Sequence, residues 1–192
     1  MPKGRVISAD VWKAYEANPL THSAAHYLMT IHALIQRQGY ARVTDIAREL
    51  SITRGSCSIS LKPLKRRELV TEDENKFLRL SEEGERLART VERNDEVLKA
   101  FLSGFLEVSD QQAQIDACKI EHLLSLEASN RLARFLQFAG SDSKEAQRFR
   151  RAFEAFEPEC DGDVDACLMC DEACESEPGS KMKRKGKSPT RS

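Results

Sequence analysis

The stretch Asp116–Ser125, DACKIEHLLS, organises the interpretation of this 192-residue chain. If it is helical, Cys118, Glu121 and His122 stand at positions i, i+3 and i+4 and share one face. A thiol, a carboxylate and an imidazole are different ligands for divalent metals, and one ion can use all three at this spacing. The alternative interpretation places Cys118 in the core as a small residue and leaves Glu121 and His122 as surface groups.

The composition is that of a globular protein, with 40% hydrophobic and 32% charged residues. No apolar run is long enough to span a membrane, so no membrane partner is expected. The N-terminus has charged and polar residues where a signal peptide has an apolar segment, and this predicts a cytoplasmic protein. In that compartment the six cysteines are not expected to form a disulfide framework.

The net charge of −1 hides an uneven distribution along the chain. Residues 41–70 are rich in Lys and Arg, residues 157–177 are acidic without a single base, and the last twelve residues are basic again. The distribution therefore predicts a basic N-terminal module followed by an acidic, cysteine-bearing tail.

The N-terminal half has the pattern of a winged helix-turn-helix. Apolar periodicity predicts helices over 23–37, 43–50 and 54–67, the last with Thr53 as its N-cap. The tight turn before Arg54 is typical of a helix-turn-helix, and the segments 69–72 and 77–80 predict a β-hairpin wing. Pro63 is expected to kink the third helix or to break it into two segments.

The second half of the chain is predicted to be helical, apart from its tail. Ser81 is expected to cap a long helix that reaches about Phe105, and further helices are expected over 111–124, 127–138 and 143–156. The fold class is therefore mainly α, with an N-terminal winged helix-turn-helix domain followed by an α-helical domain, for which the family resemblance given below implies metal binding and dimerisation. The expected organisation is a leader (1–20), the DNA-binding domain (21–82), the helical domain (83–140), a helical extension (141–156) and a cysteine-rich acidic tail with a basic end (157–192).

The third predicted helix carries the candidates for DNA contact. Short polar side chains at a helix N-terminus can approach base edges in the major groove, whereas lysines neutralise phosphates. Winged helices also serve as protein-interaction modules, which is the alternative. The candidates for base contact are Thr53, Arg54, Ser56, Ser58 and Ser60, and those for phosphate contact are Lys62 and Lys65.

Four motifs together resemble the diphtheria toxin repressor and manganese transport regulator family of metal-dependent repressors. They are His26–His32 (HYLMTIH), Gly39–Ala47 (GYARVTDIA), Leu78–Gly84 (LRLSEEG) and Asp116–Ser125, and the resemblance covers about residues 22–138. It implies a homodimeric, two-domain repressor that binds palindromic DNA when a divalent metal occupies a site between the domains.

The resemblance also implies a ligand set. The family's regulatory site falls on Cys118, Glu121 and His122, together with His26, where the family usually has Met or Asp. One thiol, one carboxylate and two imidazoles suit Fe²⁺, Zn²⁺ or Co²⁺ better than Mn²⁺, because thiolate is a soft ligand. Fe²⁺ is the favoured ion.

The family's ancillary site and its optional C-terminal domain are not expected here. Asn94, Leu98 and Gln114 replace the usual ancillary ligands, so one regulatory metal per subunit is predicted, with Asn94 as a hydrogen-bonding partner of the site. The acidic tail has no strand pattern from which an SH3-like domain could form.

The tail cysteines Cys160, Cys167, Cys170 and Cys174 lie outside the resemblance. Their spacing, C-x6-C-x2-C-x3-C, supplies four thiolates for an iron–sulfur cluster or for zinc, and redox-active or incidental thiols are the remaining alternatives. Cys57, in the third helix, is interpreted as a small packing residue.

The predicted function is a dimeric, metal-dependent transcriptional repressor that binds the operator DNA of metal-homeostasis genes. The chain has no nucleophile–base arrangement, phosphate-binding loop or H-E-x-x-H motif, so an enzyme is not expected. One alternative is a regulator of the same fold that senses iron–sulfur or redox state through the tail cysteines. A second alternative is a metal-binding carrier without operator binding.

Overall fold

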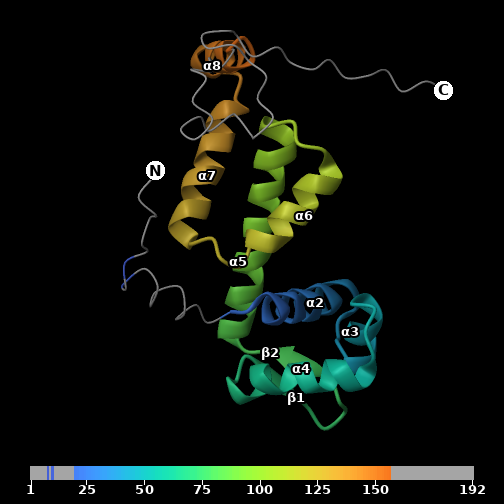
Figure 1. Ribbon diagram of the computed structural model, residues 1–192. Helices are drawn as coiled ribbons and strands as arrows, with labels where there is room; N and C mark the ends of the chain where they lie inside the picture. Colours follow the sequence, from blue (N-terminus) through green and yellow to red (C-terminus); the bar gives the residue numbers. More distant parts are fainter. Residues whose placement is uncertain (1–7, 9, 11–19, 157–192) are drawn as a thin grey trace, which may run out of the picture. The chain divides into compact units, whose positions relative to one another are not determined.

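The computed structural model describes residues 8, 10 and 20–156, and this part of the chain is mainly helical, as predicted (Figure 1). The elements are α2 (His22–Gln38), α3 (Val43–Glu49), α4 (Arg54–Arg66), β1 (Val70–Glu72), β2 (Leu78–Leu80), α5 (Glu82–Lys99), the π-helix η1 (Ala100–Phe105), α6 (Asp110–Ile120), α7 (Leu126–Ala139) and α8 (Lys144–Glu154). No helix among these residues is long and apolar enough to cross a membrane.

The predicted winged helix-turn-helix is confirmed. Thr21 caps α2 by accepting a hydrogen bond from the backbone of Ala24, and Gly39 ends this helix in the left-handed conformation at φ 83°. The hairpin is antiparallel and is attached to the helices by a bridge between Ala41 and Leu78. Helices α2, α3 and α4 and the wing enclose one apolar core, whose fully buried members include Leu28, Ile31, Leu34, Ile46, Leu61, Leu64 and Leu78.

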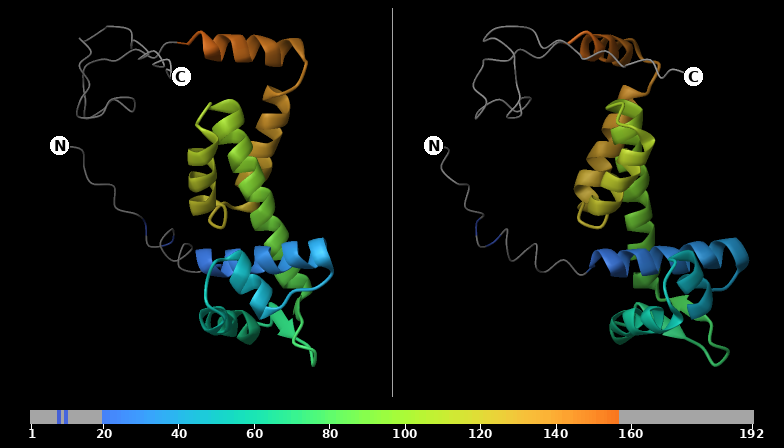
Figure 2. Two further views of the ribbon diagram at one scale, coloured as in Figure 1. Left: turned by 90° about the vertical axis from the view of Figure 1, so that its right-hand side faces the viewer. Right: turned by 45° about the vertical axis from the view of Figure 1, so that its right-hand side comes forward.

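Helix α5 connects this core to the helices that follow. Its N-terminal half packs against α2, and α6 packs beside it further along, as both views in Figure 2 show. The last turns of this long helical run widen into η1, where Phe101 and Phe105 make edge contacts with Phe135 of α7. Both α2 and α6 are therefore supported by the same helix.

Among the described residues, those between 8 and 137 form one compact unit, and residues 138–156 belong to another. In the second unit Ser143 caps α8, and Arg150 donates hydrogen bonds to the backbone oxygens of Ala139 and Ser141. The domain boundaries expected from the sequence, near residues 82 and 140, remain a prediction.

Two expectations about helix bounds differ from the structure. Pro63 was expected to kink the third helix or to break it into two segments, and the break does not occur, because α4 is a single helix from Arg54 to Arg66. A proline fixes φ at a helical value and removes only one backbone donor, and here it stands near the end of the helix. The ligand-bearing helix was expected to reach Leu124, but α6 ends at Ile120, and Glu121 is its C-cap.

Gly84 marks a close approach between α5 and the chain that enters β1. A Cβ at this position would lie 2.2 Å from the backbone oxygen of Leu69, which also accepts a hydrogen bond from the backbone of Ser81. Because this oxygen belongs to the backbone and is held by that hydrogen bond, it could move away from an added Cβ only at a cost in free energy.

The Gly84→Ala variant is therefore expected to lose about 1–3 kcal/mol of unfolding free energy through overpacking. Gly55→Ala is the matched control, since a Cβ there would meet only Thr53 Oγ1 at 3.9 Å. That control should gain roughly 0.5–1 kcal/mol from helix propensity. Urea unfolding measures both, and a Gly84→Ala variant as stable as the wild type would contradict the predicted clash.

Candidate metal centre and DNA-contacting helix

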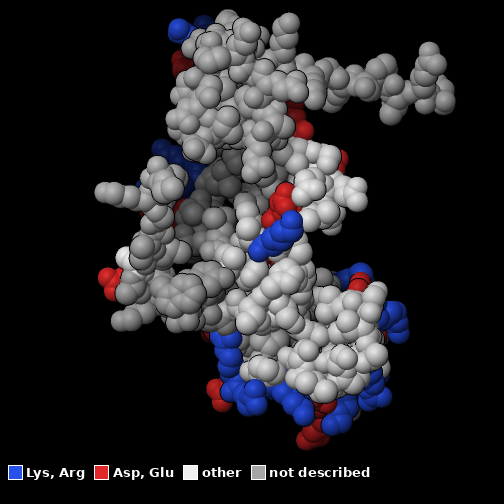
Figure 3. Space-filling model, in the orientation of Figure 1, with Lys and Arg blue, Asp and Glu red and all other residues white. Residues whose placement is uncertain are grey.

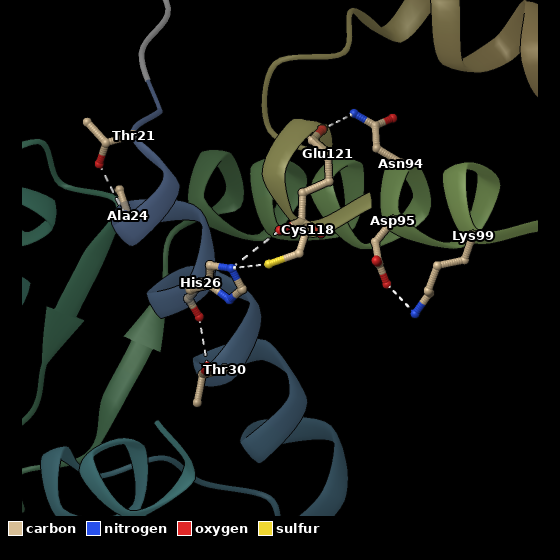
Figure 4. A network of polar contacts seen from close by, with 9 residues as sticks. All are labelled: Thr21, Ala24, His26, Thr30, Asn94, Asp95, Lys99, Cys118 and Glu121. Carbon is tan, nitrogen blue, oxygen red and sulfur yellow. Dashed lines mark hydrogen bonds and ion pairs between the residues drawn. The ribbon is translucent and has the colours of Figure 1, made fainter. Parts of the chain in front are cut away.

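His26 of α2 meets the end of α6. Its Nε2 atom lies 3.2 Å from Sγ of Cys118, a residue 92 positions later in the chain, and 3.6 Å from Oε1 of Glu121 (Figure 4). Three of the four metal ligands predicted from the sequence therefore converge on one point between α2 and α6.

A histidine that sequence reasoning missed completes this cluster. His22, His26, Cys118 and Glu121 each place one ligand atom within 4.8 Å of the others, and His122 is not one of these four. The ring of His122 lies beside that of His22, with centroids 5.2 Å apart. The available signal was the i, i+4 spacing of His22 and His26, which puts both imidazoles on one face of α2.

Asn94 holds the polypeptide at the end of α6. Its buried side-chain amide donates hydrogen bonds to the backbone oxygens of Glu121, at 2.7 Å, and of Leu124, at 3.1 Å. Those carbonyls have no partner within α6, so a side chain from α5 satisfies them. Asn94 thus fixes the backbone from which Glu121 projects, as a hydrogen-bonding partner of the site.

None of the three ancillary positions carries a His, Cys, Asp or Glu side chain. Leu98 is buried and apolar, and Gln114 is exposed. The amide nitrogen of Asn94 donates to backbone oxygens.

The carboxyl of Glu121 is the least solvated of the four groups. Burial, together with the nearby Asp95, raises its pKa to about 7, and the opposing effect of Lys99 is smaller. Among the described residues, its Oε1 atom is buried and has no hydrogen-bond partner. A buried, unsatisfied carboxylate oxygen next to a thiol and imidazoles is the environment that a divalent cation would satisfy.

Cys118 and His26 are also shifted towards their neutral forms. Burial raises the pKa of the Cys118 thiol, and the carboxylates of Glu121 and Asp95 raise it further. Burial and the neighbouring His22 lower the pKa of His26, against a smaller opposite effect of Asp95. A neutral imidazole is the form that binds metal, whereas the thiol and the carboxyl must release protons on binding.

The DNA-contact candidates lie on α4, in the part of the surface where Lys and Arg side chains gather in Figure 3. Thr53 caps α4 by accepting from the backbone of Ser56, and Lys65 forms an ion pair with Glu72 of the wing. Ser60 and Lys65 are half-buried, and the exposed candidates are Thr53, Arg54, Ser56, Ser58 and Lys62. Ile59, which the sequence reasoning passed over, is 65% exposed on the same helix.

The cysteines outside the cluster divide into two groups. Cys57 is fully buried in the core between the helices, and burial raises its pKa, as expected of a packing residue. The predicted tail site of Cys160, Cys167, Cys170 and Cys174 lies outside the described residues.

Two family models match the sequence in succession. Residues 19–78 match the iron-dependent repressor N-terminal DNA-binding domain, and residues 81–150 match the iron-dependent repressor metal-binding and dimerisation domain. The chain is 30% identical over 130 residues to the HTH-type transcriptional regulator MntR of Geobacillus kaustophilus, covering 68% of this chain and 92% of that protein. These matched proteins are transcriptional regulators and not enzymes.

Solved structures agree with this match. The manganese regulator SloR superposes with a TM-score of 0.54 at 26% identity, and a manganese-dependent transcriptional repressor in complex with manganese superposes with 0.50 at 25%. Each match covers 59% of this chain and 53% of the other, so the chain spans about half the length of these structures. ScaR with bound Zn²⁺, at 20% identity and a TM-score of 0.51, supports the fold alone.

The raised pKa of Glu121 predicts a pH-dependent stability of the metal-free protein. Between its ordinary pKa of 4.5 and the folded value of about 7, the folded state keeps a proton that the unfolded state has lost. The contribution of Glu121 to stability is therefore present at low pH and disappears as the pH rises through this window. The lowered pKa values of His26 and His122 act in the opposite direction.

Relative to Glu121→Gln, the chelator-treated wild type should lose about 2 kcal/mol of unfolding free energy between pH 5 and pH 8, from about 1.4 kcal/mol per pKa unit. The histidine contributions are common to both proteins and largely cancel in this difference. Urea unfolding at the two pH values measures it, and Glu127→Gln controls for the loss of one exposed charge. A pH-independent difference would show that Glu121 is not held protonated.

Proposed function

Since the chain belongs to the iron-dependent repressor family of metal-dependent transcriptional repressors, related to the diphtheria toxin repressor and the manganese transport regulator, we propose that it is a homodimeric Fe²⁺-responsive repressor. In this proposal a bound ion promotes binding of the dimer to a palindromic operator of metal-homeostasis genes. The family models describe one domain that binds DNA and one that binds metal and dimerises.

One observation carries the proposal. His26 belongs to α2, a helix of the winged helix-turn-helix core, whereas Cys118 lies in α6 and Glu121 is its C-cap. The Nε2 atom of His26 lies 3.2 Å from the Cys118 sulfur and 3.6 Å from a Glu121 carboxyl oxygen. An ion held by all three would tie α2 to α6. If only one arrangement of the two elements binds both the ion and the operator, the ion shifts the population towards that arrangement.

The donor set supports Fe²⁺ over Mn²⁺. Mn²⁺ prefers carboxylate, carbonyl and water oxygens, whereas this site offers a thiol and imidazole nitrogen beside one carboxyl. Zn²⁺ and Co²⁺ fit the same donors, and selection between them and Fe²⁺ depends on availability in the cell. The ligands in this proposal are His26, Cys118, Glu121 and one more imidazole, for which the sequence predicted His122.

The DNA contacts are assigned to the exposed residues of α4. Thr53, Arg54, Ser56 and Ser58 lie towards its N-terminus, where a recognition helix approaches base edges. The exposed apolar side chain of Ile59 is suited to a thymine methyl group. In a dimer, two such helices would reach half-sites about 34 Å apart, which accounts for a palindromic operator.

Lys62→Ala tests the assignment of α4. This exposed lysine should contact a phosphate, so its removal should weaken binding to specific and non-specific DNA alike and reduce the salt slope by about 1. Fluorescence anisotropy at several salt concentrations measures both. Arg131→Ala, which removes an equal charge from the exposed surface of α7, is the control and should leave the slope unchanged.

The metal switch is tested on anaerobically purified full-length protein, with an operator selected from random-sequence DNA. Wild type should bind this operator at least about 10-fold more tightly with Fe²⁺ than with chelator, the lower part of the range for allosteric coupling. His26→Ala and Cys118→Ala should each abolish the difference while keeping weak, metal-independent binding. Anisotropy with and without Fe²⁺ provides the measurement.

The rival sensor is tested in the same assay. Replacing Cys160, Cys167, Cys170 and Cys174 by Ser in the full chain should leave the Fe²⁺ response intact. Loss of the response in this variant, with a normal response in His26→Ala, would move the sensor to the tail. Metal binding without any selected operator would instead favour the carrier alternative.

A further inference from the structure

His22 and His26 form a pair of imidazoles on one face of α2. They are one helical turn apart, and their ring centroids lie 4.4 Å from each other in an edge-to-face arrangement. His22 is the first residue of the helix, directly after its N-cap Thr21. Its position relative to His26 is therefore fixed by regular helical geometry and not by a loop.

We propose that His22 is the fourth ligand of the regulatory metal and takes the coordination position that the sequence assigned to His122. This inference rests on the proposed function, because it concerns the same metal site. His22 places a ring nitrogen within 4.8 Å of the donor atoms of His26, Cys118 and Glu121. The result is a set of two imidazoles, one thiolate and one carboxylate.

The spacing of these donors fits a single tetrahedral ion. With metal–ligand bonds of about 2.0–2.3 Å, the ligands of a tetrahedral site lie roughly 3.3–3.7 Å apart. The distances from His26 Nε2 to Cys118 Sγ and to Glu121 Oε1, 3.2 and 3.6 Å, are already close to these values. Only small side-chain adjustments would bring all four donors onto one ion.

The alternative role for His22 is that of an exposed residue at the start of a helix. The exposure of His22 agrees with that role, but the contacts of its ring with other imidazoles do not. The ring lies against those of both His26 and His122. Protonated rings would repel one another at the positive end of α2, whereas ring nitrogens of His22 and His26 that face the same thiol and carboxyl can bind one cation together.

The proposal changes the role of α2 in the site. The DNA-binding part of the chain would contribute two ligands from one helix, so the ion would be coordinated by two side chains of α2 that are one turn apart. The donor types are the same as in the set predicted from the sequence, so the preference for Fe²⁺, Co²⁺ and Zn²⁺ over Mn²⁺ is unchanged.

Co²⁺ titration of the chelator-treated, reduced full-length protein tests the proposal without a DNA readout. Wild type should show the strong visible absorption of four-coordinate Co²⁺ and a near-ultraviolet thiolate-to-cobalt band. His22→Ala should keep the thiolate band, lose most of the visible intensity and bind Co²⁺ about 10- to 100-fold more weakly, at least the loss typical of removing a ligand's supporting contact. His22→Asp, which restores a donor at this position, should recover the visible intensity.

Ser23→Ala, at the exposed neighbouring position, is the control and should match wild type in spectrum and affinity. His122→Ala is the competing arm of the test. The proposal predicts that this variant retains the four-coordinate spectrum, because it gives the fourth position to His22. Circular dichroism of each metal-free variant establishes that α2 and the rest of the fold are intact.

The outcomes separate the inference from the proposed function. A wild-type spectrum and affinity in His22→Ala, with binding lost in His26→Ala and Cys118→Ala, would overturn the role of His22 and leave the proposed site standing. Loss of the four-coordinate spectrum in His122→Ala but not in His22→Ala would return the position to His122. Normal Co²⁺ binding in both His26→Ala and Cys118→Ala would remove the site itself.

Discussion

The candidate site depends on one contact, that of the His26 imidazole in α2 with the thiol and carboxyl at the end of α6. The two partners are 92 residues apart, and they meet because α2 and α6 both pack on α5. The apolar core of the winged helix sets the position of α2, and Asn94 sets that of the turn after α6. A polar cluster is thereby assembled from two parts of the chain that have separate packing environments.

The electrostatics of this cluster would couple the proposed metal binding to the release of protons. Burial favours the neutral form of each group, and it raises the pKa of Glu121 and Cys118 while it lowers that of His26. A metal needs the carboxylate and the thiolate, so binding releases protons and becomes tighter as the pH rises. A bound cation would offset the charge of the buried Glu121 carboxylate and of the half-buried Cys118 thiolate.

Local patterns predicted most of the fold and three of the four converging donors. Helix periodicity, the caps Thr53 and Ser81 and the hairpin pattern act over a few residues, so they can be read without knowledge of the tertiary structure. The end of α6 could not, because it depends on hydrogen bonds from Asn94, on another helix, to the backbone of Glu121 and Leu124. His22 was missed because the family resemblance directs attention to one position on α2, although its spacing from His26 was visible in the sequence.

Asn94 has a structural role at a position where the family resemblance implies an ancillary metal ligand. At a position where the family places a metal ligand, an amide that donates to the backbone oxygens of Glu121 and Leu124 does by hydrogen bonding what a second ion would do by coordination. It stabilises the turn that carries Glu121. With one regulatory ion per subunit, as predicted from the sequence, a steep metal response would have to arise from coupling between the subunits of the proposed dimer.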